Sequence, residues 1–195
     1  MLKSLFLNNP EESFSIYLMH STLKDAEISD LDKFIKSNNG NLNIVSIDEK
    51  VFEDAPILLH YTREMYYRLL AFKFLPTDLD RVLYLDPDIL VINSIKELYN
   101  LDIKDYLYAA AYHDAIPITK INRIRFKTYD IKTYYNTGVL LMNLENQRRV
   151  IDEKDIFKFV RDNHSKLIMP DQDILNSLYS KYVKTVDEMI YNYDA

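Results

Sequence analysis

The segment Arg81-Val82-Leu83-Tyr84-Leu85-Asp86-Pro87-Asp88 places a short apolar run directly before two carboxylates. The run, residues 82–85, is continuous and is bounded by charged residues, which is typical of a strand buried on both faces. Strands of this kind belong to parallel sheets covered by helices. In such sheets ligands bind outside the carboxyl ends of the strands. The two aspartates therefore occupy the position where a ligand site is expected.

The sequence on both sides of this segment alternates between strand and helix patterns. Strands are predicted at residues 14–19, 42–47, 82–85, 107–112 and 138–142, and helices at 28–35, 62–74, 94–97, 156–160 and 174–179. The first long helix ends near Asn39-Gly40, and the second has Thr62 as a candidate N-cap and stops before Pro76. This alternation predicts an α/β fold with a mostly parallel sheet flanked by helices, forming a single domain over residues 1–195.

The composition excludes several classes of protein. With 195 residues, of which 48% are hydrophobic, the chain can bury the core of one domain. Only 2 glycines and 6 prolines argue against a disordered linker, a collagen-like repeat or a turn-rich all-β protein. Because the chain has no cysteine, it has no disulfide framework, thiolate metal site or cysteine nucleophile.

Charge and hydropathy point to the partners and the compartment. The net charge is −6 and Arg148-Arg149 is the only adjacent basic pair, so a nucleic-acid partner is not expected. No apolar run approaches the ~20 residues that cross a bilayer, and the first residues do not form a secretory signal. We therefore predict a cytoplasmic protein without a transmembrane segment, with peripheral contact to the inner membrane surface left open.

An Asp-x-Asp triplet occurs at four places, so its context has to select among them: Asp30/Asp32, Asp78/Asp80, Asp86/Asp88 and Asp171/Asp173. The first pair lies in a helical pattern, where residues two apart point to different sides. The second pair lies in a polar loop. The fourth pair follows a proline at a helix start, where acidic residues complement the helix dipole without a ligand.

The third pair, Asp86 and Asp88, differs because it follows the apolar strand directly. Unpaired charge at such a position is costly, and a cation would compensate it. Carboxylate oxygens suit Mg²⁺ or Mn²⁺, which keep open positions for phosphate oxygens. The alternative is a solvated Asp-Pro turn. The context favours a metal site at Asp86 and Asp88.

The segment from Arg81 to Val91 resembles the metal-binding segment of glycosyltransferase family 8, which contains glycogenin and bacterial lipopolysaccharide galactosyl- and glucosyltransferases. Three further segments resemble motifs of this family in the expected order: residues 66–69 (Tyr-Tyr-Arg-Leu), 135–144 (Tyr-Asn-Thr-Gly-Val-Leu-Leu-Met-Asn-Leu) and 170–176 (Pro-Asp-Gln-Asp-Ile-Leu-Asn). The resemblance implies a GT-A fold and a retaining transferase. It also implies a UDP-glucose or UDP-galactose donor, Mn²⁺ or Mg²⁺ as cofactor, and a saccharide or glycolipid acceptor.

The resemblance also assigns substrate-binding residues. Arg68 would lie near the donor sugar and its diphosphate, although a helical ion pair with Glu64 is the alternative. Asp114 would contact the donor sugar. Asn136 and Gly138 would hold a sugar hydroxyl and allow close approach of the backbone, whereas the alternative is a simple turn before a strand.

Two residues are expected at the reacting face. Asp171 and Gln172 resemble the catalytic pair of the family. Because no well-placed carboxylate nucleophile is evident, we expect a front-face reaction in which the leaving phosphate takes the acceptor's proton. Gln172 would stabilise the oxocarbenium-like state or the incoming hydroxyl. A helix N-cap is the alternative role for Asp171.

The chain departs from the family pattern at both ends. A first strand is not found before Met1, and no segment resembles the C-terminal His-x-x-Gly-x-x-Lys-Pro-Trp-like motif of the family. We therefore expect a chain truncated at both ends, with weak donor binding, little turnover and an uncovered apolar helix face near Leu2, Leu5 and Phe6.

Two other functions compete with this interpretation. One is an inactive nucleotide-sugar-binding fragment. The other is a phosphotransferase of the haloacid dehalogenase type, in which an Asp-x-Asp also follows an apolar strand. In that class the motif usually opens the domain and is followed two residues later by Thr or Val, whereas here it lies at mid-chain and Leu90 occupies that position.

Overall fold

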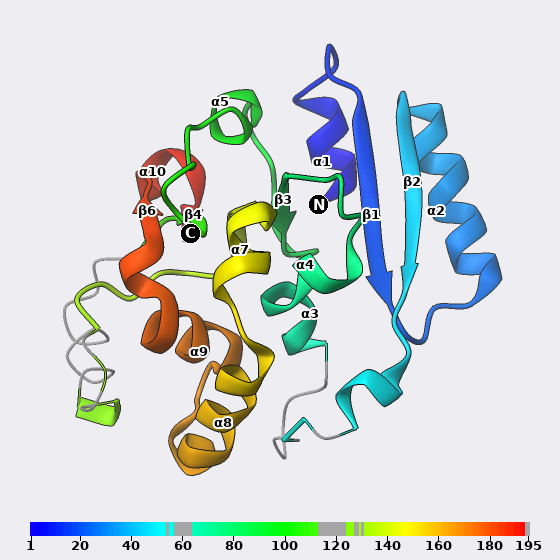
Figure 1. The fold of residues 1–195 in the computed structure, drawn as a ribbon. Helices are drawn as coiled ribbons and strands as arrows, with labels where there is room; N and C mark the ends of the chain where they lie inside the picture. The colour runs from blue at the N-terminus through cyan, green and yellow to red at the C-terminus, as the bar shows by residue number, and fades with distance from the viewer. Residues whose placement is uncertain (54, 57–63, 113–123, 127–128, 130, 194–195) are drawn as a thin grey trace. The chain divides into compact units, whose positions relative to one another are not determined.

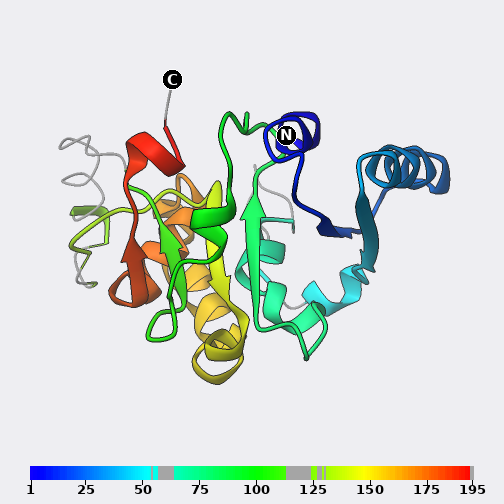
Figure 2. The ribbon, with the colours of Figure 1, turned by 90° about the horizontal axis from the view of Figure 1, so that it is seen from above.

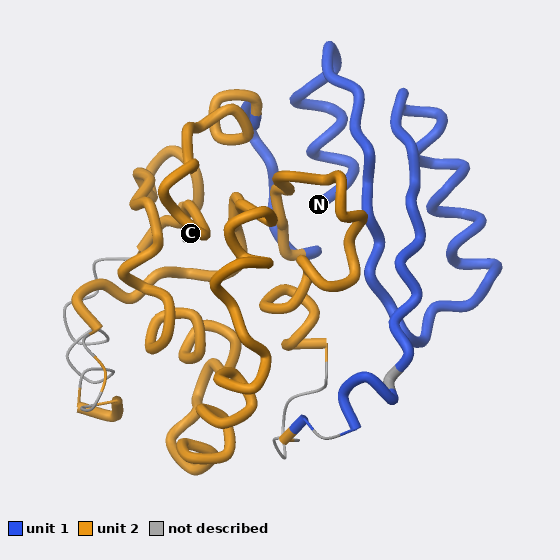
Figure 3. The backbone as a smooth tube through the Cα atoms, in the orientation of Figure 1, with its two compact units in different colours: residues 1–55, 87–95 blue, residues 56–86, 96–195 orange. Residues whose placement is uncertain are grey.

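The structure, a computed structural model, describes residues 1–53, 55–56, 64–112, 124–126, 129 and 131–193. The chain divides into two compact units, which Figure 3 shows in two colours. Unit 1 contains Met1–Ala55 and Pro87–Ile95, and unit 2 contains Pro56–Asp86 and Lys96–Ala195.

Unit 1 is built around a two-stranded parallel sheet. Strand β1 (Phe14–His20) pairs with β2 (Gly40–Ser46), and the helix α2 (Asp25–Ser37) connects them. The helix packs against β2, as Figures 1 and 2 show from two directions. A short 3₁₀ helix, η1 (Glu49–Phe52), follows the second strand. These elements confirm the strand-helix-strand pattern predicted for this part of the chain and its parallel direction.

The first helix, α1 (Leu2–Leu7), packs into the core of unit 1. Leu5 and Phe6 are buried, and the Phe6 ring meets the rings of Phe14 and Phe34 edge-on at 5.7 and 5.9 Å. The expected uncovered face is therefore wrong for Leu5 and Phe6, because both are buried and the Phe14 and Phe34 rings cover Phe6.

The turn between α2 and β2 depends on two adjacent residues. Asn39 adopts a left-handed conformation with φ of 59°. A Cβ added at Gly40 would lie 2.8 Å from Ile35 Cγ2 and 3.1 Å from Phe6 Cζ. Gly40 is therefore required because the chain passes close to α1 and α2 at this position. The left-handed conformation that reverses the chain direction is adopted by Asn39.

Unit 2 contains a four-stranded sheet in the order β3-β5-β4-β6, with β3 Arg81–Leu85, β4 Tyr108–Ala110, β5 Val139–Asn143 and β6 Val183–Thr185. Strand β5 is antiparallel to both β3 and β4, and β4 is parallel to β6. The α/β class is confirmed. The prediction of a mostly parallel sheet is wrong here, because the central strand β5 runs against both neighbours.

The reversed strand has a direct consequence for the site. The amino end of β5 therefore lies beside the carboxyl end of β3, where Leu85 pairs with Val139. The Asp86 N–H donates to the Gly138 carbonyl at 2.8 Å. Segments that follow β3 and precede β5 thus meet at one edge of the sheet.

Burial also differs between these two strands. All residues of β3 are half-buried, whereas residues 139–142 of β5 are buried. In this sheet β3 is an edge strand and β5 is an interior strand. The prediction that residues 82–85 are buried on both faces is therefore wrong, because an apolar run does not distinguish an edge strand from an interior one.

In the described part of unit 2, the helices pack around this sheet and against one another. They are α3 (Met65–Leu69), α4 (Ala71–Phe74), α5 (Lys96–Tyr99), α7 (Leu144–Val150), α8 (Glu153–Asn163), α9 (Pro170–Tyr179) and α10 (Glu188–Tyr191), with 3₁₀ turns η2 (His164–Lys166) and η3 (Ser180–Tyr182). Helix α3 packs on α9, α4 on α7, and α8 on α9. The predicted helix 62–74 is interrupted at Leu70. Its first residues, 62 and 63, lie outside the described residues. No helix in the described part of the chain is long and apolar enough to cross a membrane.

Candidate active site

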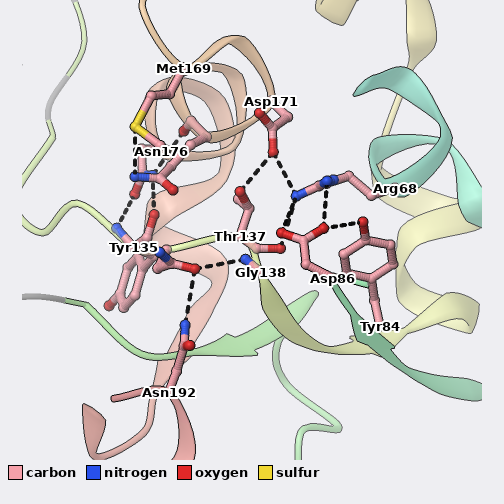
Figure 4. Close-up of polar contacts among 12 residues, drawn as sticks. Arg68, Tyr84, Asp86, Tyr135, Thr137, Gly138, Met169, Asp171, Asn176 and Asn192 are labelled. Carbon is pink, nitrogen blue, oxygen red and sulfur yellow. Dashed lines mark hydrogen bonds and ion pairs between the residues drawn. The ribbon is translucent and has the colours of Figure 1, made fainter. Parts of the chain in front are cut away.

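Arg68, on α3, joins two carboxylates that come from different elements of unit 2 (Figure 4). Its Nη2 lies 2.7 Å from Asp86 Oδ1, and its Nη1 lies 3.2 Å from Asp86 Oδ2. The same Nη1 lies 2.9 Å from Asp171 Oδ2 and donates to the Thr137 carbonyl at 3.3 Å. The alternative ion pair of Arg68 with Glu64 is not formed. The guanidinium instead fixes the ends of three segments at one place.

The environment of Arg68 keeps its charge. Burial by itself would lower the pKa of Arg68, but the nearby Asp171, Tyr84 and Asp86 raise the pKa above its ordinary value. The Arg68 side chain is 18% exposed. Its Nε is buried and has no hydrogen-bond partner among the described residues. Arg68 is therefore a permanent positive charge whose Nη groups carry all its contacts to the two aspartates.

Tyr84 supports this cluster from β3. Its hydroxyl donates to Asp86 Oδ1 at 2.5 Å, and the Arg68 guanidinium carbon lies 4.7 Å from the centre of its ring. Burial is the main cause that raises the pKa of Tyr84. The phenol therefore stays protonated at neutral pH and holds one oxygen of Asp86.

Asp171 is the second residue of α9, after Pro170 at the first helical position. The Thr137 hydroxyl donates to Asp171 Oδ2 at 2.7 Å, on the same oxygen that pairs with Arg68. A position in the first turn suits a carboxylate because of the helix dipole. No N-cap hydrogen bond from Asp171 occurs, and the N-cap residue is Met169. The carboxylate is instead directed to Arg68 and Thr137.

Asn136 precedes Thr137 at the amino end of β5. Its side-chain oxygen accepts from the Gly138 N–H at 2.7 Å and from Asn192 Nδ2 at 2.9 Å. Its backbone N–H donates to the Ala111 carbonyl at 2.9 Å. The turn proposed as the alternative at residues 136–138 is thus present, and it also orients the Asn136 side chain.

A buried amide holds the chain just before this turn. The Asn176 side chain, fully buried on α9, accepts from the Tyr135 N–H at 2.6 Å and donates to the Tyr135 carbonyl at 2.8 Å. Asn176 thereby binds both backbone groups of one residue, as a neighbouring strand would. It locks α9, and with it Asp171, to the start of β5.

Gln172 directly follows Asp171 in α9 and is buried. Its Nε2 contacts Met169 Sδ at 3.9 Å, and in the described residues its side chain makes no hydrogen bond to Arg68 or Asp86. The structure thus brings Arg68, Asp86 and Asp171 together. Asn136 and Gly138 flank Thr137, which bonds to Arg68 and Asp171. Asp114 lies outside the described residues.

The donor chemistry of the Asp-x-Asp motif fits a hard divalent cation. Among the described residues, Asp86 Oδ1 accepts from Arg68 and Tyr84 and Oδ2 accepts from Arg68 only, so Oδ2 keeps a lone pair for a cation. Asp88 belongs to unit 1 and is exposed, with no ion pair to another described residue. Among the described residues no group of three His, Cys, Asp or Glu side chains forms a ready-made metal site. The expectation that Asp86 is unpaired without a cation is wrong, because Arg68 compensates its charge.

Four residues of this cluster were not found from the sequence: Tyr84, Thr137, Asn176 and Asn192. Tyr84, Thr137 and Asn176 lie inside the segments that resemble family motifs, so their position in those segments could have marked them as site residues. Asn192 lies 56 residues from its partner Asn136, and no local pattern marks it.

Comparisons with known proteins agree with the fold and with the motifs. A lipopolysaccharide 1,2-glucosyltransferase of Escherichia coli is 28% identical over 186 residues, covering 94% of this chain and 55% of that protein. General stress protein A of Bacillus subtilis is 25% identical, covering 91% of this chain and 63% of that protein. The chain spans about half the length of the curated glucosyltransferases it matches, at 55% and 52%.

The solved structures that it resembles are glycosyltransferases of the predicted GT-A type. The structure of the galactosyltransferase LgtC in complex with donor and acceptor sugar analogs superimposes with a TM-score of 0.84 and 26% identity, covering 96% of this chain and 67% of that chain. An active-site mutant of LgtC gives the same TM-score at 25% identity. The family model described as Glycosyl transferase family 8 matches residues 1–193. The chain therefore belongs to glycosyltransferase family 8.

Proposed function

We propose that this protein is a retaining hexosyltransferase that uses UDP-glucose or UDP-galactose and a divalent metal, Mn²⁺ or Mg²⁺. The acceptor is a saccharide or a glycolipid, and the protein acts in the cytoplasm or at the inner membrane surface. The observation that carries this proposal is the placement of Arg68 between Asp86 and Asp171. Family membership supports the reaction class, and relatives named as lipopolysaccharide glucosyl- and galactosyltransferases support the acceptor class.

The charges of the cluster favour a metal-diphosphate ligand. Arg68 carries one positive charge against the two negative charges of Asp86 and Asp171, so a bare diphosphate would meet net repulsion. Asp86 and Asp88 would hold the metal, which would neutralise charge on the departing diphosphate. Arg68 keeps Asp86 in place for this role and adds a fixed positive charge.

A front-face reaction fits the bonding of the carboxylates. Asp171 Oδ2 is held by Arg68 and by the Thr137 hydroxyl, which favours an orienting role for this carboxylate. We propose that Asp171 holds Arg68 in its orientation at the reacting face. Gln172 would stabilise the positive charge of the sugar or the incoming hydroxyl. The phosphotransferase alternative would use Asp86 as the nucleophile, whereas here Asp86 is paired with Arg68 and accepts a hydrogen bond from Tyr84.

The metal assignment is tested with Asp88→Asn. Asp88 is exposed and makes no ion pair within the described residues, so the substitution removes a proposed ligand without breaking a contact. We expect Mn²⁺-dependent UDP affinity, measured by titration calorimetry, to fall at least about tenfold. The matched control is Asp78→Asn, an exposed aspartate of another Asp-x-Asp triplet, which should leave the affinity unchanged. Equal affinity of Asp88→Asn and the unmodified protein would refute the metal site.

Retention is checked with the same samples. Slow hydrolysis of UDP-glucose or UDP-galactose, followed by NMR, should release the α anomer first. If the β anomer appears first, the reaction inverts configuration and the front-face proposal is wrong.

A further inference from the structure

The hydrogen bonds around Asn136 determine which way its amide group points. A backbone N–H can only donate, so the atom that accepts from Gly138 N–H at 2.7 Å must be the Asn136 oxygen. The second partner of that oxygen, 2.9 Å away, must then be the Asn192 NH₂ group. The Gly138 N–H thus identifies the oxygen and the nitrogen in the side-chain amides of both Asn136 and Asn192. Both lone pairs of the Asn136 oxygen accept a hydrogen bond.

The other end of the Asn136 amide is left for a ligand. Its NH₂ group donates no hydrogen bond to any described residue, and Asn136, which directly precedes Thr137 and Gly138 in the chain, is half-buried. Thr137 bonds Arg68 and Asp171, and Gly138 bonds Asp86. Asn136 therefore presents two N–H donors and no acceptor at the edge of the cluster.

We propose that Asn192 is a positioning residue that fixes Asn136 as a pure hydrogen-bond donor towards an oxygen atom of the donor sugar. This inference rests on the proposed function. Asn192 is the C-cap residue of α10, and its backbone N–H is bound to the Glu188 carbonyl at 3.1 Å, so its side chain reaches Asn136 from a defined helix end. The sugar group recognised by Asn136 is then one that accepts a hydrogen bond.

The test is Asn192→Asp, which preserves shape but replaces the donor with a carboxylate. The carboxylate repels the Asn136 oxygen, and the Asn136 amide can satisfy it only by turning its NH₂ group away from the ligand. UDP lacks the sugar and serves as the internal reference. We expect the affinity for UDP-glucose or UDP-galactose, relative to UDP, to fall about tenfold, as for a lost hydrogen bond to a buried partner.

The matched control is Asn146→Asp in helix α7, which follows β5. Asn146 is also half-buried, and its Nδ2 also bridges to another segment, donating to the Lys104 carbonyl at 2.7 Å. This variant loses a comparable hydrogen bond and should keep the affinity ratio of the unmodified protein. Asn192→Ala, which removes the donor without adding charge, should give a smaller loss than Asn192→Asp. Equal ratios in all variants, or equal losses for UDP and UDP-sugar, would overturn the assignment.

A ligand-free measurement separates this inference from the proposed function. In Asn192→Asp the Gly138 N–H loses its well-oriented acceptor, so its hydrogen exchange should accelerate, while Asn146→Asp leaves it unchanged. Unchanged Gly138 exchange in Asn192→Asp would show that Asn192 does not orient Asn136. If the unmodified protein binds neither UDP nor a UDP-sugar, the proposed function is wrong, and the exchange experiment still decides the positioning role.

Discussion

At the scale of single residues, Arg68 is the side chain on which the cluster depends. Its planar guanidinium contacts Asp86 through both Nη atoms and Asp171 through one of them. Lysine has the same charge, but its single ammonium group cannot reproduce this arrangement. We expect Arg68→Lys to lower UDP-sugar turnover by roughly 10–100-fold, which corresponds to the loss of one or two charge-assisted hydrogen bonds.

The control for Arg68→Lys is a second well-bonded arginine away from the cluster. Arg148 donates to the carbonyls of Phe72, Pro76 and Leu79. Arg148→Lys should lower thermal stability and leave turnover of the folded protein unchanged. If both variants lose the same activity, Arg68 contributes only to stability.

The residue types of the site could be predicted from the sequence, but their pairings could not. Asp86 and Asp88 stood out because they follow an apolar strand. Arg68 compensates the charge of Asp86, which lies 18 positions away in the sequence. The contact between Arg68 and Asp171 joins residues that are much farther apart in the sequence. Such pairings are set by packing, which a local pattern does not report.

At the scale of elements, the start of α9 is held by one buried carboxylate. Asp173 is fully buried and accepts from Tyr134, from Arg125 and from the N–H groups of Ile168 and Met169, at 2.6–3.1 Å. These bonds fix the turn that precedes α9 and thereby the position of Asp171. We expect Asp173→Asn to destabilise the fold by about 3–5 kcal/mol, because a buried charge pair loses one partner. Urea unfolding measures this change.

A surface aspartate supplies the comparison for Asp173→Asn. Asp32 pairs with Lys36 across one turn of α2 at 2.7 Å, where the Lys36 side chain is largely in solvent and the Asp32 side chain is 32% exposed. Asp32→Asn should change the free energy of unfolding by no more than about 1 kcal/mol. Similar losses for the two variants would show that Asp173 does not anchor α9.

The elements that could be predicted are those with a strong local pattern. The strand 14–20, the helix 25–37 and α9 each carry a run or spacing of apolar residues, and the helix also has a stop at Asn39-Gly40. The direction of β5 has no such signal, because an apolar run reads the same whether its neighbour is parallel or antiparallel. Strand β6 and helix α10 were missed because elements of 3 and 4 residues are too short to show a period.

At the scale of the whole molecule, the chain contains 16 tyrosines, and several are deeply placed. Burial is the main cause that raises the pKa above the ordinary 10.0 in five of them: Tyr66, Tyr84, Tyr108, Tyr134 and Tyr179. All five belong to unit 2. Four of them, Tyr66, Tyr108, Tyr134 and Tyr179, are buried core residues, whereas Tyr84 is half-buried in β3 and belongs to the Arg68 cluster.

These tyrosines predict a loss of stability in alkali. Above pH 10 the unfolded chain releases phenolic protons that the folded chain retains, so the free energy of unfolding falls as the pH rises, by about 1.4 kcal/mol per proton and pH unit. Below pH 10 both states are protonated and this contribution is fully present. Tyr108 offers a clean test, because its hydroxyl is buried and has no hydrogen-bond partner among the described residues. Tyr108→Phe should be at least as stable at pH 8, since no hydrogen bond is lost. Urea unfolding between pH 8 and 11.5 should show a shallower alkaline decline in Tyr108→Phe than in the unmodified protein. An identical decline in the two proteins would mean that Tyr108 ionises as readily when folded as when unfolded, and that its burial does not protect the phenol.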